Sequence, residues 1–172
     1  VPCFSASSLR FLQQLQEFTA TVDPHMIQGA DVYAPCPTEP HHPDLMWYGI
    51  HGVELLLTIL GPDWLSVHRH QTADTDVIVG TWRDGRTGVF RGSRTAHDGF
   101  GAFIHTDCGV RWVRRDDEVL YVNLVKEILR FFHNGIPPVC RYETESVFAF
   151  MEAAHLSGQE HRTVVTPLES VA

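Results

Sequence analysis

The stretch DVIVGTWRDGRTGVFRGSR, residues 76–94, indicates the fold class of this chain. Two runs rich in β-branched and aromatic residues, Asp76–Trp82 and Thr87–Arg94, lie on either side of the pair Asp84-Gly85. Such runs favour β-strands, and an Asp-Gly pair supplies the positive φ that a tight turn between antiparallel strands requires. We therefore predict a β-hairpin at these residues.

Similar short runs, separated by turn residues, extend the strand block on both sides of the hairpin. They are Trp64–His70, Phe100–Thr106 and Val110–Arg115. Together with the hairpin they make five strands in succession, which predicts an antiparallel sheet. We expect one further short strand at Gly29–Tyr33 and a last strand near Thr163–Thr166.

Apolar residues at helical spacing lie on both sides of this strand block. The expected helices are Leu9–Phe18, capped by Ser7 or Ser8, then Leu45–Leu60, Val119–Phe132 and about Glu143–Leu156. The residues Val1-Pro2-Cys3-Phe4 resemble a strand end. Because helices and strands are segregated along the chain, we predict an α+β fold in a single domain.

Composition excludes several classes of protein. The chain has 172 residues with 13 Lys and Arg against 21 Asp and Glu, a net charge of −8, which argues against nucleic acid as the main partner. No apolar run approaches the length that crosses a bilayer, so we expect no membrane partner. The four cysteines lie far apart and are interpreted as free thiols, and no glycine-rich phosphate loop or serine-nucleophile motif is present.

The 11 histidines raise the question of a metal site. The candidate ligands lack any zinc-binding spacing, so we favour ordinary strand and core histidines over a metal site; these candidates are His41, His42, His51, Glu54, His68 and His70. His51 lies in the most apolar expected helix, and the loop Glu39–Asp44 places titratable groups at the start of that helix. A ligand pocket is one interpretation of this pattern, and a satisfied core histidine is the other.

Arginine dominates the basic residues of the strand block. Its planar group suits hydrogen bonds to carboxylates, to hydroxyls or to a facing subunit, and a solvated face paired with Asp and Glu explains the pattern equally well. The residues are Arg83, Arg86, Arg91, Arg94, Arg111, Arg114 and Arg115.

Four segments in this order resemble one protein family. They are FSASSLRF at residues 4–11, WYGIHGVE at 47–54, GTWRDGRTG at 80–88, and Pro137-Pro138 followed by MEAAHLS at 151–157. The chain is similar to the glucose-fructose oxidoreductase and inositol dehydrogenase (Gfo/Idh/MocA) family. The likeness covers nearly the whole chain, but only the C-terminal, substrate-binding domain of that family.

The resemblance implies an open-faced, mostly antiparallel sheet with helices packed on one face. Residues 1–10 would be the remnant of the last strand of a missing nucleotide-binding domain, and residues 11–172 the substrate-binding and oligomerisation domain. The chain starts at Val1 without Met, and we expect the preceding part to be missing. NAD or NADP would be bound mainly by that preceding domain, so no cofactor-binding residue and no bound cofactor is expected in this chain alone.

The resemblance also implies a function: hydride transfer between a nicotinamide cofactor and a sugar, a sugar derivative or a cyclitol. His51 matches the family's catalytic histidine, whereas the Asp expected four residues earlier is replaced by Trp47, which cannot hold a proton. Substrate contacts are expected from His41, His42, Trp47, Tyr48 and Arg91. The alternative is a non-catalytic carbohydrate-binding or oligomerisation module.

Two further expectations concern the surroundings of the molecule. A sheet with helices on only one side leaves a face to be covered, so we expect a homo-oligomer that associates through the sheet face. No targeting segment is visible, so a cytoplasmic location is expected by default.

Overall fold

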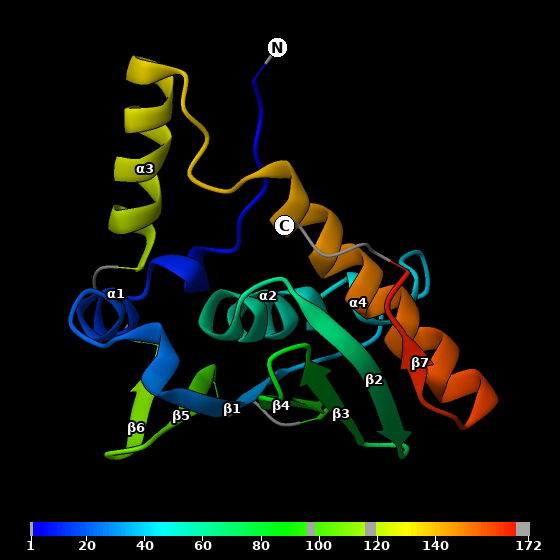
Figure 1. The fold of residues 1–172 in the computed structure, drawn as a ribbon. Coiled ribbons are helices and arrows are strands. Elements are labelled where there is room, and N and C mark those ends of the chain that lie inside the picture. The colour runs from blue at the N-terminus through cyan, green and yellow to red at the C-terminus, as the bar shows by residue number, and fades with distance from the viewer. Residues whose placement is uncertain (1, 96–98, 116–119, 168–172) are drawn as a thin grey trace.

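Within the described part of the chain, a seven-stranded sheet with all helices on one side forms the core (Figure 1). The computed structural model describes residues 2–95, 99–115 and 120–167. The strands follow the order β6-β5-β1-β4-β3-β2-β7, and every neighbouring pair is antiparallel except β1 and β4. Their bounds are β1 Ile27–Pro35, β2 Trp64–Gln71, β3 Thr75–Trp82, β4 Thr87–Ser93, β5 Gly101–Thr106, β6 Gly109–Arg114 and β7 Val164–Val165.

The α+β class and the open-faced, mostly antiparallel sheet are therefore confirmed. The hairpin is confirmed as well, with Gly85 at φ 91° and the Trp82 N–H donating to the carbonyl of Arg86 at 2.8 Å. The helices, including short 3-10 turns labelled η, are η1 Ser8–Phe11, α1 Gln13–Thr19, η2 Pro24–Met26, η3 Asp44–Met46, α2 Gly49–Leu60, α3 Leu120–Asn134 and α4 Arg141–Glu160.

The place of β1 differs from the expected order of strands. The strands β4 and β5 follow each other in sequence but do not pair, because β1 lies between them, parallel to β4 and antiparallel to β5. This strand carries short side chains such as Ala30 and Ala34, both buried, and α2 packs closely over it. Such residues have low β-propensity, so the sequence signal for β1 is weak although this strand lies in the interior of the sheet.

Two of the expected helices are interrupted, and the expected strand end is not formed. The first helix divides at Leu12, and the second divides into η3 and α2 around Trp47 and Tyr48. Residues 2–7 form neither helix nor strand and extend away from the sheet (Figure 1). Val1 and Val119, where two predicted elements begin, lie outside the described residues.

Helix α2 is the most buried helix and lies directly on the sheet. Its apolar side chains include Val53, Leu55 and Leu56, each of them 0% exposed. Close approach to the sheet depends on Gly52, since a Cβ atom there would lie 2.3 Å from the ring of Phe90 on β4. A glycine inside a helix weakens it by roughly 1 kcal/mol relative to alanine, so this position is explained by packing and not by helix propensity.

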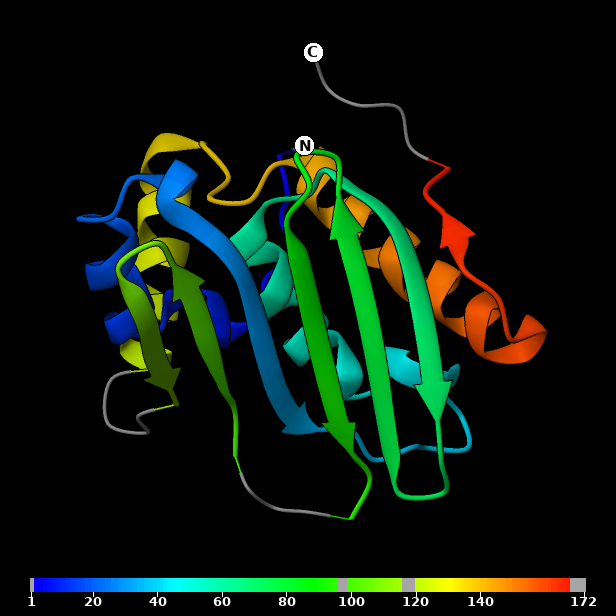
Figure 2. The same ribbon diagram turned by 60° about the horizontal axis from the view of Figure 1, so that its bottom comes forward.

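The opposite face of the sheet carries no helix among the described residues, as Figure 2 shows. Cross-strand neighbours form rows on this face, because alternate residues of each strand point away from α2. One such row, in order across six strands, is Trp112, Phe103, Asp31, Val89, Val79 and His68.

The packing of Gly52 against Phe90 yields a direct prediction. We expect Gly52→Ala to lower the free energy of unfolding by about 2–3 kcal/mol, since overpacking outweighs the gain in helix propensity. Urea unfolding followed by circular dichroism measures the change. The double variant Gly52→Ala/Phe90→Leu is the control and should recover part of the loss; a Gly52→Ala protein as stable as the parent would contradict this account of the packing.

Candidate functional site

Helix α2 brings His51 against the N-terminal segment of the chain. The Nδ1 atom of His51 lies 3.0 Å from the hydroxyl oxygen of Ser7, across 44 positions of sequence. The imidazole also makes edge-to-face contacts with two aromatic rings, Tyr48 at 5.3 Å and Phe100 at 6.1 Å between centroids. One ring nitrogen is thus hydrogen-bonded and the ring plane is fixed by its neighbours.

Glu54, one helical turn beyond His51, fastens the same N-terminal segment to α2. Its carboxylate accepts the backbone N–H of Ser7 at 2.8 Å and the Nε of Arg10 at 3.1 Å. Arg10 also pairs with Glu143 on α4 at 2.7 Å. Burial raises the pKa of Glu54, and the Arg10 charge and the two hydrogen bonds oppose this shift. The segment that carries Ser7 is therefore held by buried polar contacts.

A small hollow opens beside His51. Its walls combine hydrogen-bonding groups with aromatic rings, and Arg115 places its guanidinium over the ring of Phe100 at 5.8 Å. Burial lowers the pKa of His51 below its ordinary value of 6.5, so the imidazole is neutral near pH 7. A neutral imidazole beside polar and aromatic walls suits a small hydroxylated ligand. The lining residues are Ser7, Ser8, Leu9, Tyr48, His51, Phe100, Arg115, Leu120 and Tyr121.

The structure places the expected substrate contacts in three locations. Tyr48 lies against His51, as described above. His42 and Trp47 form an exposed pair with ring centroids 4.5 Å apart, and the Glu39 carboxylate bonds His42 Nδ1 at 2.8 Å. The same carboxylate accepts the backbone N–H of His41 at 2.8 Å. Glu39 thus holds His41 and His42, and Trp47 packs on His42, at the start of the region that leads into α2.

Arg91 is not brought together with His51. It is an exposed residue of β4, and its neighbour Phe90 points towards α2. Successive side chains of a strand point to opposite faces, so Arg91 lies on the open face of the sheet. A pocket on the helix side does not include it.

The sequence analysis missed several residues of this site. Ser7 was expected only as a helix cap, and it does accept the N–H of Leu9 at 3.3 Å, but it also reaches His51. Arg10 and Phe100 lay inside recognised segments without a signal that distinguished them. Glu54 was considered only as a metal ligand; its spacing of three residues from His51 placed it on the same helix face, which was the available clue.

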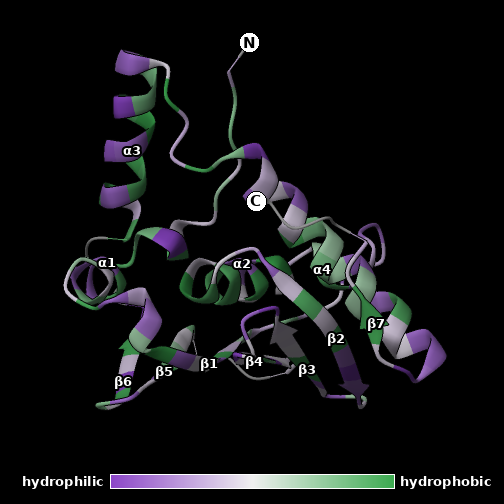
Figure 3. Ribbon diagram, in the orientation of Figure 1, coloured by the Kyte–Doolittle hydropathy of each residue, from purple (hydrophilic) through white to green (hydrophobic). Residues whose placement is uncertain are grey.

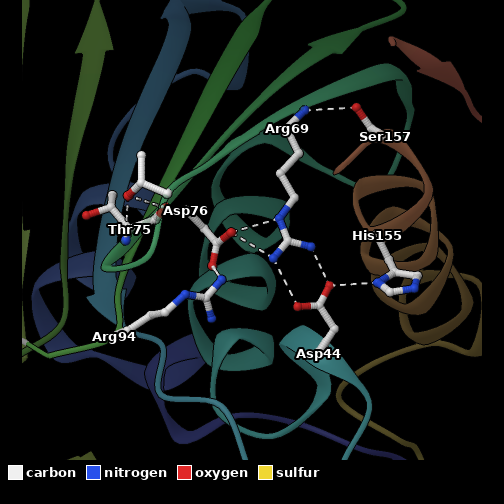
Figure 4. Close-up of polar contacts among 8 residues, drawn as sticks. Asp44, Arg69, Thr75, Asp76, Arg94, His155 and Ser157 are labelled. Carbon is white, nitrogen blue, oxygen red and sulfur yellow. Dashed lines mark hydrogen bonds and ion pairs between the residues drawn. The ribbon is translucent and has the colours of Figure 1, made fainter. Parts of the chain in front are cut away.

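A buried ionic cluster holds the loop that leads into α2 (Figure 4). The guanidinium of Arg69 on β2 binds both carboxylate oxygens of Asp44 and also bonds Asp76 on β3 at 2.7 and 2.8 Å. Arg94 pairs with the other oxygen of Asp76 at 2.5 Å, and His155 on α4 bonds Asp44 at 2.9 Å. The cluster therefore ties η3 to two strands and to α4.

This cluster constrains a strained backbone position. Asp44 has φ 38°, which is unfavourable for a residue with a side chain and persists only when surrounding contacts enforce it. The Arg69 side chain is 1% exposed and that of Asp76 is 0% exposed, so each charge depends on the other for compensation. By fixing Asp44, the cluster determines where Trp47, Tyr48 and then α2 begin.

Partial burial alone would raise the pKa of Asp44, but hydrogen bonds from Arg69 and His155 outweigh burial and hold it below its usual 3.8. Among the described residues, no group of three or more His, Cys, Asp and Glu side chains is arranged to hold a metal ion. None of the helices in the described ranges is long and apolar enough to cross a membrane.

Comparison with known proteins gives a match only at the level of structure. No family model matches the sequence, and no curated protein matches it either. Among solved structures, a probable dehydrogenase from Thermotoga maritima shares 18% identity with a TM-score of 0.75, over 92% of this chain and 63% of its own. The chain shares the fold of part of that protein.

Two myo-inositol dehydrogenases support the same conclusion. The enzyme from Corynebacterium glutamicum shares 12% identity with a TM-score of 0.74, over 94% of this chain and 64% of its own. The enzyme from Lactobacillus casei, solved in complex with NAD(H) and myo-inositol, shares 14% with a TM-score of 0.70, over 97% of this chain and 61% of its own. This chain therefore spans less than two thirds of each of these dehydrogenases, and the fold expected from the family resemblance is confirmed.

The lowered pKa of Asp44 predicts an acid-sensitive contribution to stability. Because the folded-state pKa lies below the unfolded value of 3.8, this contribution is present above that pH and is lost as pH falls through the folded-state pKa. We expect Asp44→Asn to lower the free energy of unfolding by about 1–3 kcal/mol at pH 7. The difference from the parent should shrink below about pH 4.

Urea unfolding at a series of pH values tests this expectation. Asp84→Asn is the matched control, since its carboxylate pairs with Arg86 on the surface and its side chain is 54% exposed. The control should change stability by no more than about 0.5 kcal/mol. An Asp44→Asn protein with parental stability at pH 7 would show that the cluster does not hold the loop.

Proposed function

We propose that this chain is the substrate-binding domain of a NAD(P)-dependent oxidoreductase that acts on a sugar, a sugar derivative or a cyclitol by hydride transfer. The observation that carries the proposal is His51: a half-buried imidazole with lowered pKa, bonded to Ser7, at a hollow in a dehydrogenase fold. Solved structures of that fold include a complex with NAD(H) and myo-inositol, which supports the substrate class.

His51 is proposed as the acid/base that handles the hydroxyl proton of the substrate. When Nδ1–H donates to the Ser7 oxygen, Nε2 keeps its lone pair and accepts the proton of a bound hydroxyl. Ser7 orients the ring and does not take the substrate proton itself, since a serine hydroxyl neither gains nor loses a proton near pH 7. Because Ser7 bonds the His51 ring directly, the proposal does not require a hydrogen-bonding role for Trp47, which stands where the family has an Asp.

Substrate contacts are proposed on two sides of His51. Tyr48, Phe100 and Arg115 line the hollow and offer a ring face, a second ring and a cation to a hydroxylated ligand. His41, His42 and Trp47 form the exposed group around Glu39 and are proposed to contact the outer part of the ligand. Arg91 is not part of this proposal, because it lies on the open sheet face.

The proposed cofactor is NAD or NADP, held outside this chain. The described residues contain no glycine-rich turn from a strand into a helix that could cradle a dinucleotide pyrophosphate. They therefore do not fit the phosphate half of the cofactor. A longer protein would need to supply that site, as the greater length of the matched dehydrogenases suggests.

Association through the open sheet face is proposed for the same protein. One end of this face is aromatic: Phe103 and Trp112 stack with centroids 6.0 Å apart, and Arg114 lies 5.1 Å from the Trp112 ring. Exposed aromatic and arginine side chains are enriched in protein interfaces, and Val79, 40% exposed, adds an apolar side chain farther along the same face. A second copy of the chain would cover these groups.

The acid/base role predicts the behaviour of His51→Asn in the enzyme. Asparagine preserves approximate size and hydrogen bonding but removes the titratable nitrogen, so we expect turnover to fall by about 100-fold or more. The parent's rate of alcohol oxidation should fall as pH drops through a pKa below about 6.5, because protonated His51 cannot accept the hydroxyl proton. Steady-state kinetics across pH measure both effects.

His25→Asn serves as the control because His25 is an exposed residue of η2. It should retain parental turnover and pH dependence. A well-folded His51→Asn enzyme with normal turnover would remove His51 from the mechanism and favour the non-catalytic module.

The association proposal has its own test. We expect sedimentation velocity to show an oligomer at high micromolar concentration, and Phe103→Glu should shift it to monomer because a buried unpaired charge opposes association. Val122→Glu on α3, remote from the sheet face, is the comparison variant. A parent protein that remains monomeric under these conditions would contradict the proposal.

A further inference from the structure

Ser7, the hydrogen-bond partner of His51, belongs to a segment without regular structure. Residues 2–7 form neither helix nor strand, and holding such a segment in one conformation costs backbone entropy. Ser7 is nevertheless only 5% exposed, and its hydroxyl lies 3.0 Å from His51 Nδ1. Contacts other than secondary structure must therefore hold this residue in place.

The Glu54 carboxylate contacts the short turn η1 at two points. Its Oε2 accepts the backbone N–H of Ser7, the N-cap residue of η1, at 2.8 Å, and its Oε1 accepts Nε of Arg10 at 3.1 Å. Within the turn, the Ser7 hydroxyl oxygen also accepts the N–H of Leu9 at 3.3 Å. The turn is thus fixed on α2, and the position of the Ser7 hydroxyl follows from it.

Glu54 and His51 reach Ser7 from the same face of α2, since they are three residues apart on the helix. Glu54 bonds the backbone of Ser7, and His51 contacts its hydroxyl. These two contacts and the α2 backbone form a closed ring that joins Ser7 to the helix one turn apart. Losing the Glu54 contact would leave the Ser7 hydroxyl held mainly by the turn itself.

The contact with Ser7 decides which atom of His51 faces the hollow. Tyr48 and Phe100 fix the plane of the imidazole through edge-to-face contacts. A half-turn about the Cβ–Cγ bond keeps this plane, and the side-chain torsion of histidine is roughly two-fold. Such a half-turn would put a carbon atom where Nε2 lies. The bond from Nδ1 to Ser7 favours one of the two orientations, because a ring carbon cannot replace it.

The Glu54 carboxylate is itself held by charge on an apolar helix. Figure 3 shows that α2 is hydrophobic over most of its length. The side chains of Glu54 and Arg10 are only 9% and 12% exposed, so each charge requires the other. Arg10 is oriented in turn by Glu143 on α4, at 2.7 Å. The carboxylate is therefore kept ionised and aimed at the Ser7 N–H.

We propose that Glu54 is a positioning residue for His51: by accepting the Ser7 N–H, it holds the Ser7 hydroxyl where that group keeps the imidazole proton on Nδ1 and the Nε2 atom free. Arg10 and Glu143 orient the Glu54 carboxylate for this task. The inference rests on the proposed function only for the use of Nε2 as a base. Where the imidazole proton lies is a property that can be measured without a substrate.

Two double variants of the full-length protein differ only in whether they offer an acceptor to the Ser7 N–H. In Glu54→Gln/Arg10→Met, the amide oxygen replaces the carboxylate oxygen, and the donor that would face the amide NH₂ is removed. In Glu54→Leu/Arg10→Met, the volume is similar but the acceptor is lost. Both variants remove the buried ion pair, so a difference between them does not come from an unpaired charge.

Nitrogen-15 NMR of histidine-labelled protein reports the position of the His51 proton at pH 7. We expect the parent and the Gln/Met variant to carry it on Nδ1, and the Leu/Met variant to lose at least about half of this population. In the assay used for His51→Asn, kcat should fall about 10-fold in the Leu/Met variant and stay within about 3-fold of the parent in the Gln/Met variant.

Two further variants keep the test decisive. Glu54→Asp retains the charge but is one methylene too short for the Ser7 N–H, so it should lose the Nδ1–H population as the Leu/Met variant does. Ser7→Ala should do the same, and adding Glu54→Leu/Arg10→Met to Ser7→Ala should cause no further loss, as expected for residues that act through one contact.

The matched control is Glu145→Gln/Arg141→Met, which removes an exposed ion pair of α4 whose atoms lie 2.6 Å apart. It should keep the parental spectrum and turnover. The melting temperature of each variant establishes that it is folded, and a lower melting temperature with an unchanged histidine spectrum would reduce Glu54 to a purely structural residue and overturn the proposal.

The remaining outcomes separate this inference from the proposed function. Equal loss in the Gln/Met and Leu/Met variants, or additive loss with Ser7→Ala, would overturn the route through the Ser7 N–H. A protein that shows the expected proton positions but oxidises no sugar would sustain the positioning and refute the reaction. A sugar dehydrogenase whose His51 spectrum is the same in the parent and in the Leu/Met variant would do the reverse.

Discussion

The buried guanidinium of Arg69 is the constraint around which the helix side of the sheet is arranged. A cation with a 1% exposed side chain requires carboxylates at fixed positions, and Asp76 and Asp44 supply them from β3 and η3. Asp44 accepts an unfavourable backbone conformation to do so. The loop before α2, and hence the start of the helix that carries His51, follows from this ionic cluster.

Because the start of α2 is fixed, the helix also fixes the positions of the side chains that it carries to the candidate site. Its sheet-facing side is set by the contact of Gly52 with Phe90, and its other side holds the N-terminal segment through Glu54 and His51. The hollow thus has one wall from the helix and another from the segment by which the chain enters. His51 therefore lies at the boundary between α2 and the N-terminal segment.

The two uncovered surfaces of the molecule differ in position and in chemistry. The open sheet face combines stacked aromatic rings with arginines and histidines, whereas α3 exposes the apolar side chains Val122, Val125, Leu129 and Phe132. They lie on opposite sides of the sheet (Figure 1).

The sequence by itself determined the features that depend on local patterns. Asp84-Gly85 specified the hairpin through its backbone preference, and apolar spacing located α2 and α4 to within a few residues. The tertiary structure alone decided the central place of β1, the partnership of Ser7 with His51 and the pairing of Arg69 with Asp44. Each of these contacts joins residues that are far apart in the chain. Local conformational preference carries no information about such contacts, because their stabilisation arises only when packing removes water from both partners.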